Sequence, residues 1–297
     1  MITRTHPAGT IRLALPHKGR LSERALALLE SAGLRAGYRA DRSLMATLGD
    51  DFQALFVRAA DVPEFVADGA ADLGVTGADL VEESGRRVTE LLDLGFGVCR
   101  LVAAVPEDAP IRALSEIPAG TRVATSFPRI TAGFFRGMGI SVEIAPVSGA
   151  AEIAPKLGVA DVVVDLTSTG STLRVHHLRE VGTLLESSAR LIANPDALER
   201  DEGVARSAAE LATALDSVLR AQRKRYLMAN VPRARLREVR EVLPGLSGPT
   251  VVEVLDGGGW VAAHAVVDEA ALYPTISRLK ALGAEGILVT RIERLTP

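Results

Sequence analysis

The sequence predicts an α/β protein with two lobes, followed by a ferredoxin-like unit. Short apolar runs alternate with helical patterns from residue 11 to residue 194. Two extended stretches, 97–106 and 188–194, are typical of segments that cross between lobes. From residue 226 onwards the order is strand, helix, strand, strand, helix, strand, which is the split β-α-β arrangement. Two lobes with two crossings predict a cleft between them, a common place for a small ligand.

Composition excludes several classes of protein. The chain has 297 residues, of which 47% are apolar and 4% aromatic, with a net charge of −3. Scarce aromatics and the lack of a long basic run argue against nucleic acid as a partner. The single cysteine, Cys99, excludes an internal disulfide and a thiolate metal cluster. Because residues 1–10 lack an apolar signal core and no run reaches membrane length, we expect a soluble cytoplasmic protein without a membrane partner.

The first lobe begins with a strand at 11–15, and the loop after it carries two cations around a glycine, Lys18, Gly19 and Arg20. We expect Ser22 to cap the helix that follows. Ligands of open α/β sheets bind at the carboxyl ends of strands, so this loop is a candidate anion contact. A solvated basic turn is the alternative.

The next strands of this lobe bring further charges. The strand at 52–57 ends in Arg58, and a helix capped by Asp61 follows it. A glycine-rich segment at 71–79 reads as a short strand before another helix, with Asp72 and Leu73 near its start. Arg58 and Asp72 are candidates for one pocket, and a structural ion pair between them is the alternative.

The second lobe repeats the alternation. Its predicted elements are a strand at 122–125, a helix at 130–138, a strand at 141–145, a helix at 150–157 that Gly158 ends, and a buried strand that ends in Asp165.

The loop after Asp165 is the most informative stretch of the chain. It consists of small hydroxyl residues around Gly170, and an apolar pattern from Leu173 starts a short helix. The first N–H groups of a helix lack partners within the helix and attract anions, and a glycine lets the backbone approach closely. We interpret the loop as a phosphate cradle, with Asp165 facing sugar hydroxyls or a metal-bound diphosphate. An ordinary strand-to-helix turn with Ser and Thr caps is the alternative.

The last part of the chain begins after a long helical pattern at 206–225. Basic residues at the end of this helix suit the helix dipole, and we interpret them as a solvated helix end rather than a nucleic-acid patch. Strands at 226–231, 250–255, 260–267 and 286–292 and helices at 235–243 and 269–282 are expected, with a hairpin turn at 256–259.

The motifs together resemble the ATP phosphoribosyltransferase family in its long, self-regulated form. They occur in family order over nearly the whole chain from residue 11, with His17 standing where the family often has Asn. The segments that carry the resemblance are Pro16-His17-Lys18-Gly19-Arg20-Leu21, Arg58-Ala59-Ala60-Asp61-Val62-Pro63, 69–79, 94–97, 158–161, 165–173, 243–250 and 282–287.

The resemblance implies a fold, a reaction and an assembly. The fold is a two-lobed core similar to periplasmic binding proteins plus a regulatory domain. The implied boundaries are 1–101 with 188–222 for the first lobe, 102–187 for the second and 223–297 for the regulatory domain. The reaction is Mg²⁺-dependent transfer of phosphoribose from phosphoribosyl pyrophosphate to N1 of ATP. Family members form dimers and hexamers, and histidine inhibits them.

The resemblance also implies roles for individual residues. Asp165, Lys18 and Arg20 are the candidate catalytic residues, and Mg²⁺ is expected mainly on the substrate diphosphate and water. The sugar phosphate is assigned to Asp161, Asp165, Thr167, Ser168, Thr169, Gly170, Ser171, Thr172 and Leu173. ATP is assigned to Lys18, Gly19, Arg20, Arg58, Asp72 and Leu73, and the histidine effector to Asn230, Thr250, Ala284 and Gly286.

The chemistry fits these residues, because adenine N1 has a free lone pair and its attack needs no general base. Three rival functions remain open: a solute-binding protein, a phosphoribosyltransferase for a free nucleobase, and a silent regulatory protein. The first predicts a signal peptide. The second often has two adjacent acids before its loop, whereas Leu166 follows Asp165 here. The adjacent His176 and His177 do not predict a metal site, since neighbours on a helix point apart.

Overall fold

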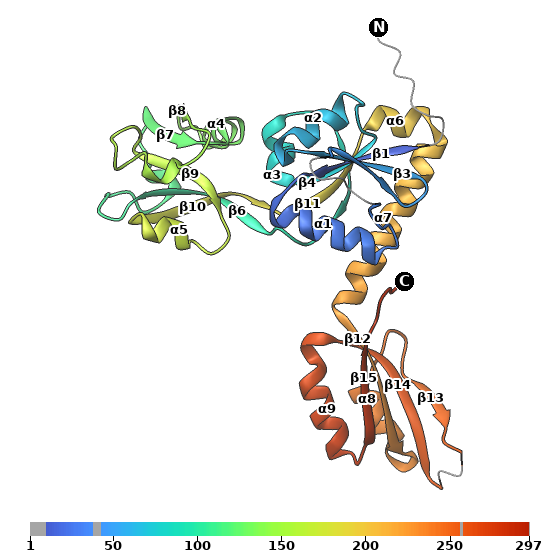
Figure 1. Cartoon of the computed structure of the whole chain (residues 1–297). Coiled ribbons are helices and arrows are strands. Elements are labelled where there is room, and N and C mark those ends of the chain that lie inside the picture. The colour runs from blue at the N-terminus through green and yellow to red at the C-terminus, as the bar shows by residue number, and fades with distance from the viewer. Residues whose placement is uncertain (1–9, 38–42, 256–257, 297) are drawn as a thin grey trace. The chain divides into compact units, whose positions relative to one another are not determined.

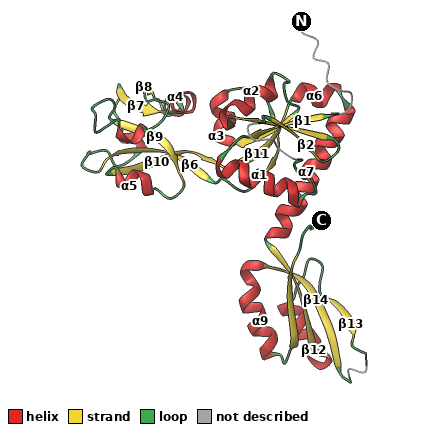
Figure 2. Cartoon of the chain, viewed as in Figure 1, coloured by secondary structure: helices red, strands yellow, loops and turns green. Residues whose placement is uncertain are grey.

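The structure is a computed structural model that describes residues 10–37, 43–255 and 258–296 (Figure 1). The chain divides into two compact units, residues 1–212 and 213–297. The first unit contains two separate sheets and the second contains one (Figure 2). Within the described ranges, no helix is long and apolar enough to cross a membrane.

The first lobe is built on a six-stranded mixed sheet. Its central strands β1, β3 and β4 are parallel, so their carboxyl ends lie at one edge of the sheet. The strands in spatial order are β2 (Met45–Leu48), β3 (Phe52–Val57), β1 (Ile11–Pro16), β4 (Leu73–Gly77), β11 (Ala189–Ala193) and β5 (Thr89–Asp93). The helices are α1 (Gly19–Ser31), α2 (Val62–Ala67), α3 (Ala78–Ser84), α6 (Pro195–Arg200) and the start of α7 (Glu202–Gln222).

The second lobe is built on a five-stranded sheet with a core on each face. Leu101 and Val164 belong to the core on one face, whereas Val102 and Val163 pack with Leu173 on the other. The strands in spatial order are β10 (Leu178–Ser187), β6 (Cys99–Pro106), β9 (Val162–Thr167), β7 (Thr121–Thr125) and β8 (Val142–Pro146). The helices are α4 (Pro128–Gly137) and α5 (Ser171–Val175).

Two chain segments join the lobes. One runs from β5 into β6 and the other from β10 into β11, so both strands of the β6–β10 pair lead back to the first sheet (Figure 1). This confirms the predicted two-lobed α/β core.

The second unit has the predicted ferredoxin-like order. Its elements are β12 (Lys224–Pro232), α8 (Leu236–Val242), β13 (Thr250–Glu253), β14 (Trp260–Asp268), α9 (Leu272–Ala281) and β15 (Glu285–Arg291). The sheet order is β13-β14-β12-β15 and all its pairs are antiparallel. Residues 256 and 257 of the predicted hairpin turn lie outside the described residues.

Several expected bounds were wrong, each for a local reason. Helix α1 begins at Gly19 rather than after Ser22, which is buried inside the helix. The helix expected at 150–157 is only a 3₁₀ turn, Ala151–Ile153, because Pro155 lacks an N–H to continue it. Strand β9 continues beyond Asp165 to Thr167. Strands β2 and β10 and helix α6 were not predicted.

Candidate functional site

The hydroxyl-rich loop lies between β9 and α5, as predicted, and its own side chains order it. The buried Thr167 Oγ1 accepts a hydrogen bond of 2.8 Å from the Gly170 N–H. Thr169 Oγ1 donates 3.0 Å to Ser171 Oγ. Gly170 has φ +71°, a conformation that glycine adopts without strain. The loop is thus held in a tight turn, with Ser168 exposed at its tip.

The end of the loop is anchored by apolar packing. Leu173 is 4% exposed and packs on Val102 and Val163, whereas Ser171 and Thr172 at the start of α5 are exposed. The Gly170 and Ser171 N–H groups donate to Thr167 Oγ1 and Thr169 Oγ1, so the next N–H groups of the first turn, which have no intrahelical acceptors, are the donors for an anion. The arrangement presents hydroxyl and N–H donors on a fixed base.

Asp165 lies two residues before this loop and is half-buried. Burial raises the pKa of its carboxyl group above the usual range; the Leu166 N–H that it accepts at 2.7 Å lowers the pKa, and the negative charge of Glu152 raises it. Glu152 Oε1 lies 4.0 Å from His176 Nε2. The sequence analysis did not identify Glu152, because only the 3₁₀ turn brings it beside β9.

Backbone strain surrounds the Glu152–His176 contact. Among the described residues, Ala150 and His177 are the two residues other than glycine with positive φ, at 53° and 54°. Such conformations cost energy and often occur at functional sites. Ala150 lies two residues before Glu152, and His177 directly follows His176, so the strained residues flank both partners of this contact.

Asp161 lies at the other end of β9. Its carboxylate accepts the Arg122 N–H at 3.2 Å, and its own N–H donates to the Arg122 carbonyl at 2.9 Å. The six-residue strand, at about 3.3 Å per residue, separates it from the loop. The structure therefore does not bring Asp161 together with Asp165, and its substrate role stays a prediction.

The cationic loop of the first lobe lies at the carboxyl ends of β1 and β3. His17 donates its N–H to the Val57 carbonyl at 2.8 Å, which places Lys18 beside Arg58 at this edge of the sheet. Lys18, Arg20 and Arg58 are all exposed. Gly19 has φ +81° and open space around its missing side chain. The structure brings these predicted residues to one edge.

Asp72 and Leu73 lie at the opposite edge of that sheet, at the start of β4. Asp72 Oδ2 accepts the Arg12 N–H at 2.8 Å, and the Asp72 carbonyl accepts the Asn194 N–H at 2.9 Å. Leu73 is fully buried. Arg58 and Asp72 therefore do not meet, and neither the ion pair nor the shared pocket is seen. The predicted role of Asp72 in ATP binding stays untested.

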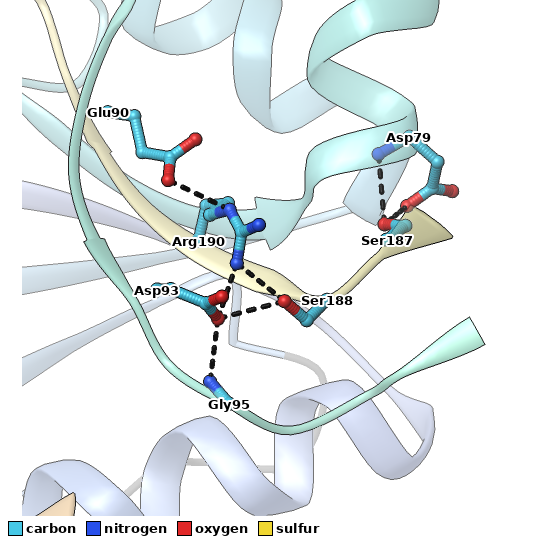
Figure 3. Close-up of polar contacts among 7 residues, drawn as sticks. All are labelled: Asp79, Glu90, Asp93, Gly95, Ser187, Ser188 and Arg190. Atoms are coloured by element: carbon cyan, nitrogen blue, oxygen red, sulfur yellow. Dashed lines mark hydrogen bonds and ion pairs between the residues drawn. The ribbon is translucent and has the colours of Figure 1, made fainter. Parts of the chain in front are cut away.

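A polar network occupies the crossing between the lobes (Figure 3). Arg190 of β11 pairs with Glu90 and Asp93 of β5, and Ser188 Oγ donates 2.8 Å to Asp93 Oδ1. Burial raises the pKa of Asp93, but hydrogen bonds from Gly95 and Ser188 and the charge of Arg190 outweigh it and lower the pKa overall. This network fixes the position at which the segment from β10 enters the first sheet as β11.

A second contact at the crossing joins α3 to β10. Ser187 Oγ donates 2.6 Å to Asp79 Oδ1 and accepts the Asp79 N–H at 3.0 Å (Figure 3). Both side chains are buried. Burial raises the pKa of the nearby Cys99 thiol, as does the charge of Asp79. Sequence reasoning missed these residues, because their partners are up to 108 positions apart.

The predicted effector residues lie in the second unit. Asn230 and Thr250 share the sheet face opposite the helices, and Gly286, with φ +57°, would place a Cβ 3.4 Å from Asn230 Nδ2. Ala284 is buried beside them at the start of β15. The same open face carries a 2.6 Å hydrogen bond between Tyr226 and His264. Asn230 on β12, Ala284 directly before β15 and Gly286 within β15 are therefore neighbours, whereas Thr250 lies on β13.

Known proteins resemble this chain along its whole length. Residues 58–217 match the family described as ATP phosphoribosyltransferase, and residues 221–294 match the family described as HisG, C-terminal domain. An ATP phosphoribosyltransferase of Gemmatimonas aurantiaca is 60% identical over 295 residues, which cover 97% of this chain and 100% of the relative. One of Methanothermobacter thermautotrophicus is 49% identical over 288 residues, covering 97% and 99%.

A solved structure agrees with these matches. The ATP phosphoribosyl transferase (HisG:HisZ) complex from Thermotoga maritima contains a chain that superposes with a TM-score of 0.60 at 28% identity. The superposition covers 70% of this chain and 99% of that chain.

Proposed function

This chain belongs to the ATP phosphoribosyltransferase family, whose members carry out the first step of histidine biosynthesis, and we propose its detailed reaction and site. The reaction transfers the 5-phosphoribosyl group from phosphoribosyl pyrophosphate to N1 of ATP and releases pyrophosphate. The observation that supports the proposal most is the ordered hydroxyl-rich loop at the carboxyl end of β9, directly after the half-buried Asp165. Both substrates are cytoplasmic metabolites, so the reaction would run there.

The sugar phosphate binds in the second lobe in this proposal. The 5-phosphate accepts hydrogen bonds from the exposed hydroxyl residues Ser168, Thr169, Ser171 and Thr172 and from the N–H group of Leu173 in the first turn of α5. Asp165 accepts hydrogen bonds from the ribose hydroxyls, since a carboxylate is a strong acceptor. Thr167 and Gly170 also shape the loop, because the Thr167 hydroxyl accepts the Gly170 N–H.

ATP binds at the edge of the first lobe. Lys18, Arg20 and Arg58 supply positive charge there, and Gly19 leaves room for the backbone to approach a phosphate. Arg20 can make two parallel hydrogen bonds to one phosphate, whereas Lys18 acts as a point charge. Asp72 and Leu73, at the opposite edge, can affect this site only through the strands that they join.

The chemistry requires positioning and charge stabilisation. As pyrophosphate leaves, positive charge builds on the sugar and negative charge on the leaving group. Adenine N1 attacks with its own lone pair, so no side chain removes a proton. Asp165, beside the sugar, faces the developing positive charge, and Lys18 and Arg20 stabilise the phosphates. Alignment of this kind lowers barriers by roughly 7–11 kcal/mol.

We propose Mg²⁺ as the metal of the reaction, carried mainly by the substrate diphosphate and water. Among the described residues, no three His, Cys, Asp or Glu side chains form a group that could hold a metal ion. Mg²⁺ usually keeps several waters and binds to one or two carboxylates together with substrate phosphates. A site without a cage of protein ligands is therefore compatible with Mg²⁺. The ion supplies charge neutralisation to the leaving diphosphate.

The second unit has a regulatory role in this proposal, with histidine as its effector and a homo-oligomer, a dimer or hexamer, as the assembly. Asn230 and Thr250, on the open sheet face, Ala284, directly before β15, and Gly286, within β15, are the proposed contacts. To inhibit, histidine must bind one assembly or lobe arrangement more tightly than another.

The deciding experiment measures pyrophosphate release from ATP plus phosphoribosyl pyrophosphate with Mg²⁺, with and without histidine. Release that histidine suppresses supports the reaction and the regulatory role together. Release that ignores histidine supports the reaction and leaves the second unit with assembly alone. Release with a free nucleobase but not with ATP overturns the proposed acceptor.

A matched pair of variants tests the site itself. Arg20→Met should raise KM for ATP, whereas Arg24→Met, one helical turn further along α1 and also exposed, should not. Equal effects of the two substitutions would show that the surface charge of α1 matters rather than the position of Arg20.

A further inference from the structure

An ion pair lies beneath the hydroxyl-rich loop. Arg100 of β6 pairs with Glu180 of β10 at 3.1 Å, and Arg100 Nη1 donates 3.1 Å to Thr183 Oγ1. The two charged side chains are 36% and 32% exposed, so the pair is partly buried. Arg100 stands opposite Thr167 in the β6–β9 pairing. The pair therefore belongs to the strands that carry the loop.

The carboxylate of this pair touches the loop. Glu180 Oε1 lies 3.1 Å from where a Cβ on Gly170 would stand, and Arg174 Nη1 lies 3.3 Å from the same point. Arg174 Nη1 also donates 3.2 Å to the Thr169 carbonyl. The turn that binds a phosphate in the proposed function thus has the Glu180 carboxylate and the Arg174 guanidinium on either side of the same point.

The charge of Glu180 affects a phosphate bound on the loop. A phosphate on this loop lies within one Debye length, about 10 Å at 0.1 M ionic strength, of the Glu180 carboxylate. An unpaired carboxylate there would repel a dianion. Arg100 holds Glu180 by hydrogen bonds and cancels its charge.

Resting on the proposed function, we propose that Arg100 is a positioning residue for the sugar-phosphate substrate. It neutralises Glu180, which supports the loop at Gly170, so that the loop keeps its shape without repelling the 5-phosphate. Glu180 in turn keeps the Arg100 guanidinium on the strand surface. The sequence analysis assigned no role to either residue.

The test measures the Kd of ribose 5-phosphate by calorimetry for the whole chain and three variants. Arg100→Met should weaken binding about 10-fold, because Glu180 loses its ion-pair partner and its negative charge is no longer cancelled. Glu180→Gln should tighten binding about threefold, since the amide keeps the shape and loses the charge. The double variant should return to within about threefold of the unchanged protein.

Two further readouts separate charge from simple damage to the fold. The difference between Arg100→Met and the unchanged protein should shrink in about 0.5 M KCl, because salt screens the repulsion. Substitution of the exposed Arg35–Glu30 pair, as Arg35→Met and Glu30→Gln, should leave Kd unchanged. If Arg100→Met fails to fold, the tightening by Glu180→Gln still tests the proposal.

Clear results would overturn it. A double variant as weak as Arg100→Met, weaker binding by Glu180→Gln, or no binding of ribose 5-phosphate to the unchanged protein would each contradict the proposal. If ribose 5-phosphate binds as expected but ATP and phosphoribosyl pyrophosphate release no pyrophosphate, the proposed reaction is wrong while the role of Arg100 stands.

Discussion

Strands β4 and β9, one in each lobe, begin with the same hydrogen-bonding motif. Each follows a Gly-x-Ala-Asp sequence, residues 69–72 and 158–161, whose glycines have φ +68° and +66°. In each, the Asp N–H donates to a carbonyl of the neighbouring strand, at 3.0 Å from Asp72 and 2.9 Å from Asp161. The carboxylate then accepts the N–H of the same neighbour, at 2.8 Å and 3.2 Å.

The carboxyl ends of the two strands differ. After β4 the chain enters α3 at once, and Asp79 is buried against Ser187 at the crossing (Figure 3). After β9 comes the exposed hydroxyl loop, and Asp165 remains half-buried just before it. The shared motif therefore starts a strand in both lobes. The two lobes differ in the segments that follow these strands. An Asp in the motif and an Asp near the carboxyl end should behave differently when replaced.

The largest effect expected from this comparison is that of Asp165→Asn. It should lower kcat/KM for phosphoribosyl pyrophosphate on the order of 100-fold, because the ribose loses a charged acceptor and its alignment. The protein should be as stable as before or more so at pH 7, because burial makes the ionised carboxylate costly. Steady-state kinetics and thermal unfolding check the two parts. Unchanged kcat/KM would remove Asp165 from the mechanism.

The pH dependence should carry the signature of the same residue. The raised pKa of Asp165 places the acid limb of kcat/KM above about pH 3.9, the usual value for Asp. A carboxyl whose folded-state pKa is raised contributes stability below its unfolded pKa, and that stability is lost as pH rises through the folded pKa. The stability gain of Asp165→Asn should therefore be larger at pH 7 than at pH 4. A gain that does not vary with pH would contradict this assignment.

Local signals predicted most of the fold. Apolar strands such as 52–57 and the alternation of elements carry their own pattern, and the split arrangement of the second unit follows from element order alone. The failures have physical causes. Ser22 looked like a cap, but the helix begins earlier and buries it, and β10 was missed because its ten residues are mostly half-buried and show no clean alternation.

The site was predictable only where one segment carries it. Residues 165–173 are contiguous and run from the end of β9 through the hydroxyl-rich loop into α5. Asp72 and Asp161 were assigned to substrates from the resemblance, and the structure places both at the amino ends of their strands, where their carboxylates bind the N–H groups of Arg12 and Arg122. Glu180 and Arg100 meet only through pairing of distant strands, so no local pattern reveals them.

A Gly→Ala substitution at the carboxyl end of β4 and of β9 should have different effects. After β9 it should affect substrate binding, and at the end of β4 it should affect the stability of the segment that joins the lobes. Gly170→Ala puts a side chain at φ +71°, at a cost of about 1–2 kcal/mol, and against Glu180. It should raise KM for phosphoribosyl pyrophosphate about 10-fold. Gly77→Ala has an allowed φ of −77°, but its Cβ would meet the Asp79 carboxylate, so it should disturb the crossing and lower the unfolding temperature. If Gly77→Ala raised that KM as much, the two ends would not differ as proposed.

The smallest effects should come from the shared motif. Asp72→Ala removes the shorter, partly buried hydrogen bond and should lower the free energy of unfolding by about 1–2 kcal/mol, whereas Asp161→Ala removes a longer, exposed one and should cost less than about 1 kcal/mol. Neither should change KM for its predicted substrate beyond about twofold, because both carboxylates lie at the amino ends of their strands. Denaturant unfolding and steady-state kinetics on both variants decide this. A tenfold rise in KM for ATP in Asp72→Ala, without loss of stability, would instead support the ATP role that the resemblance implies.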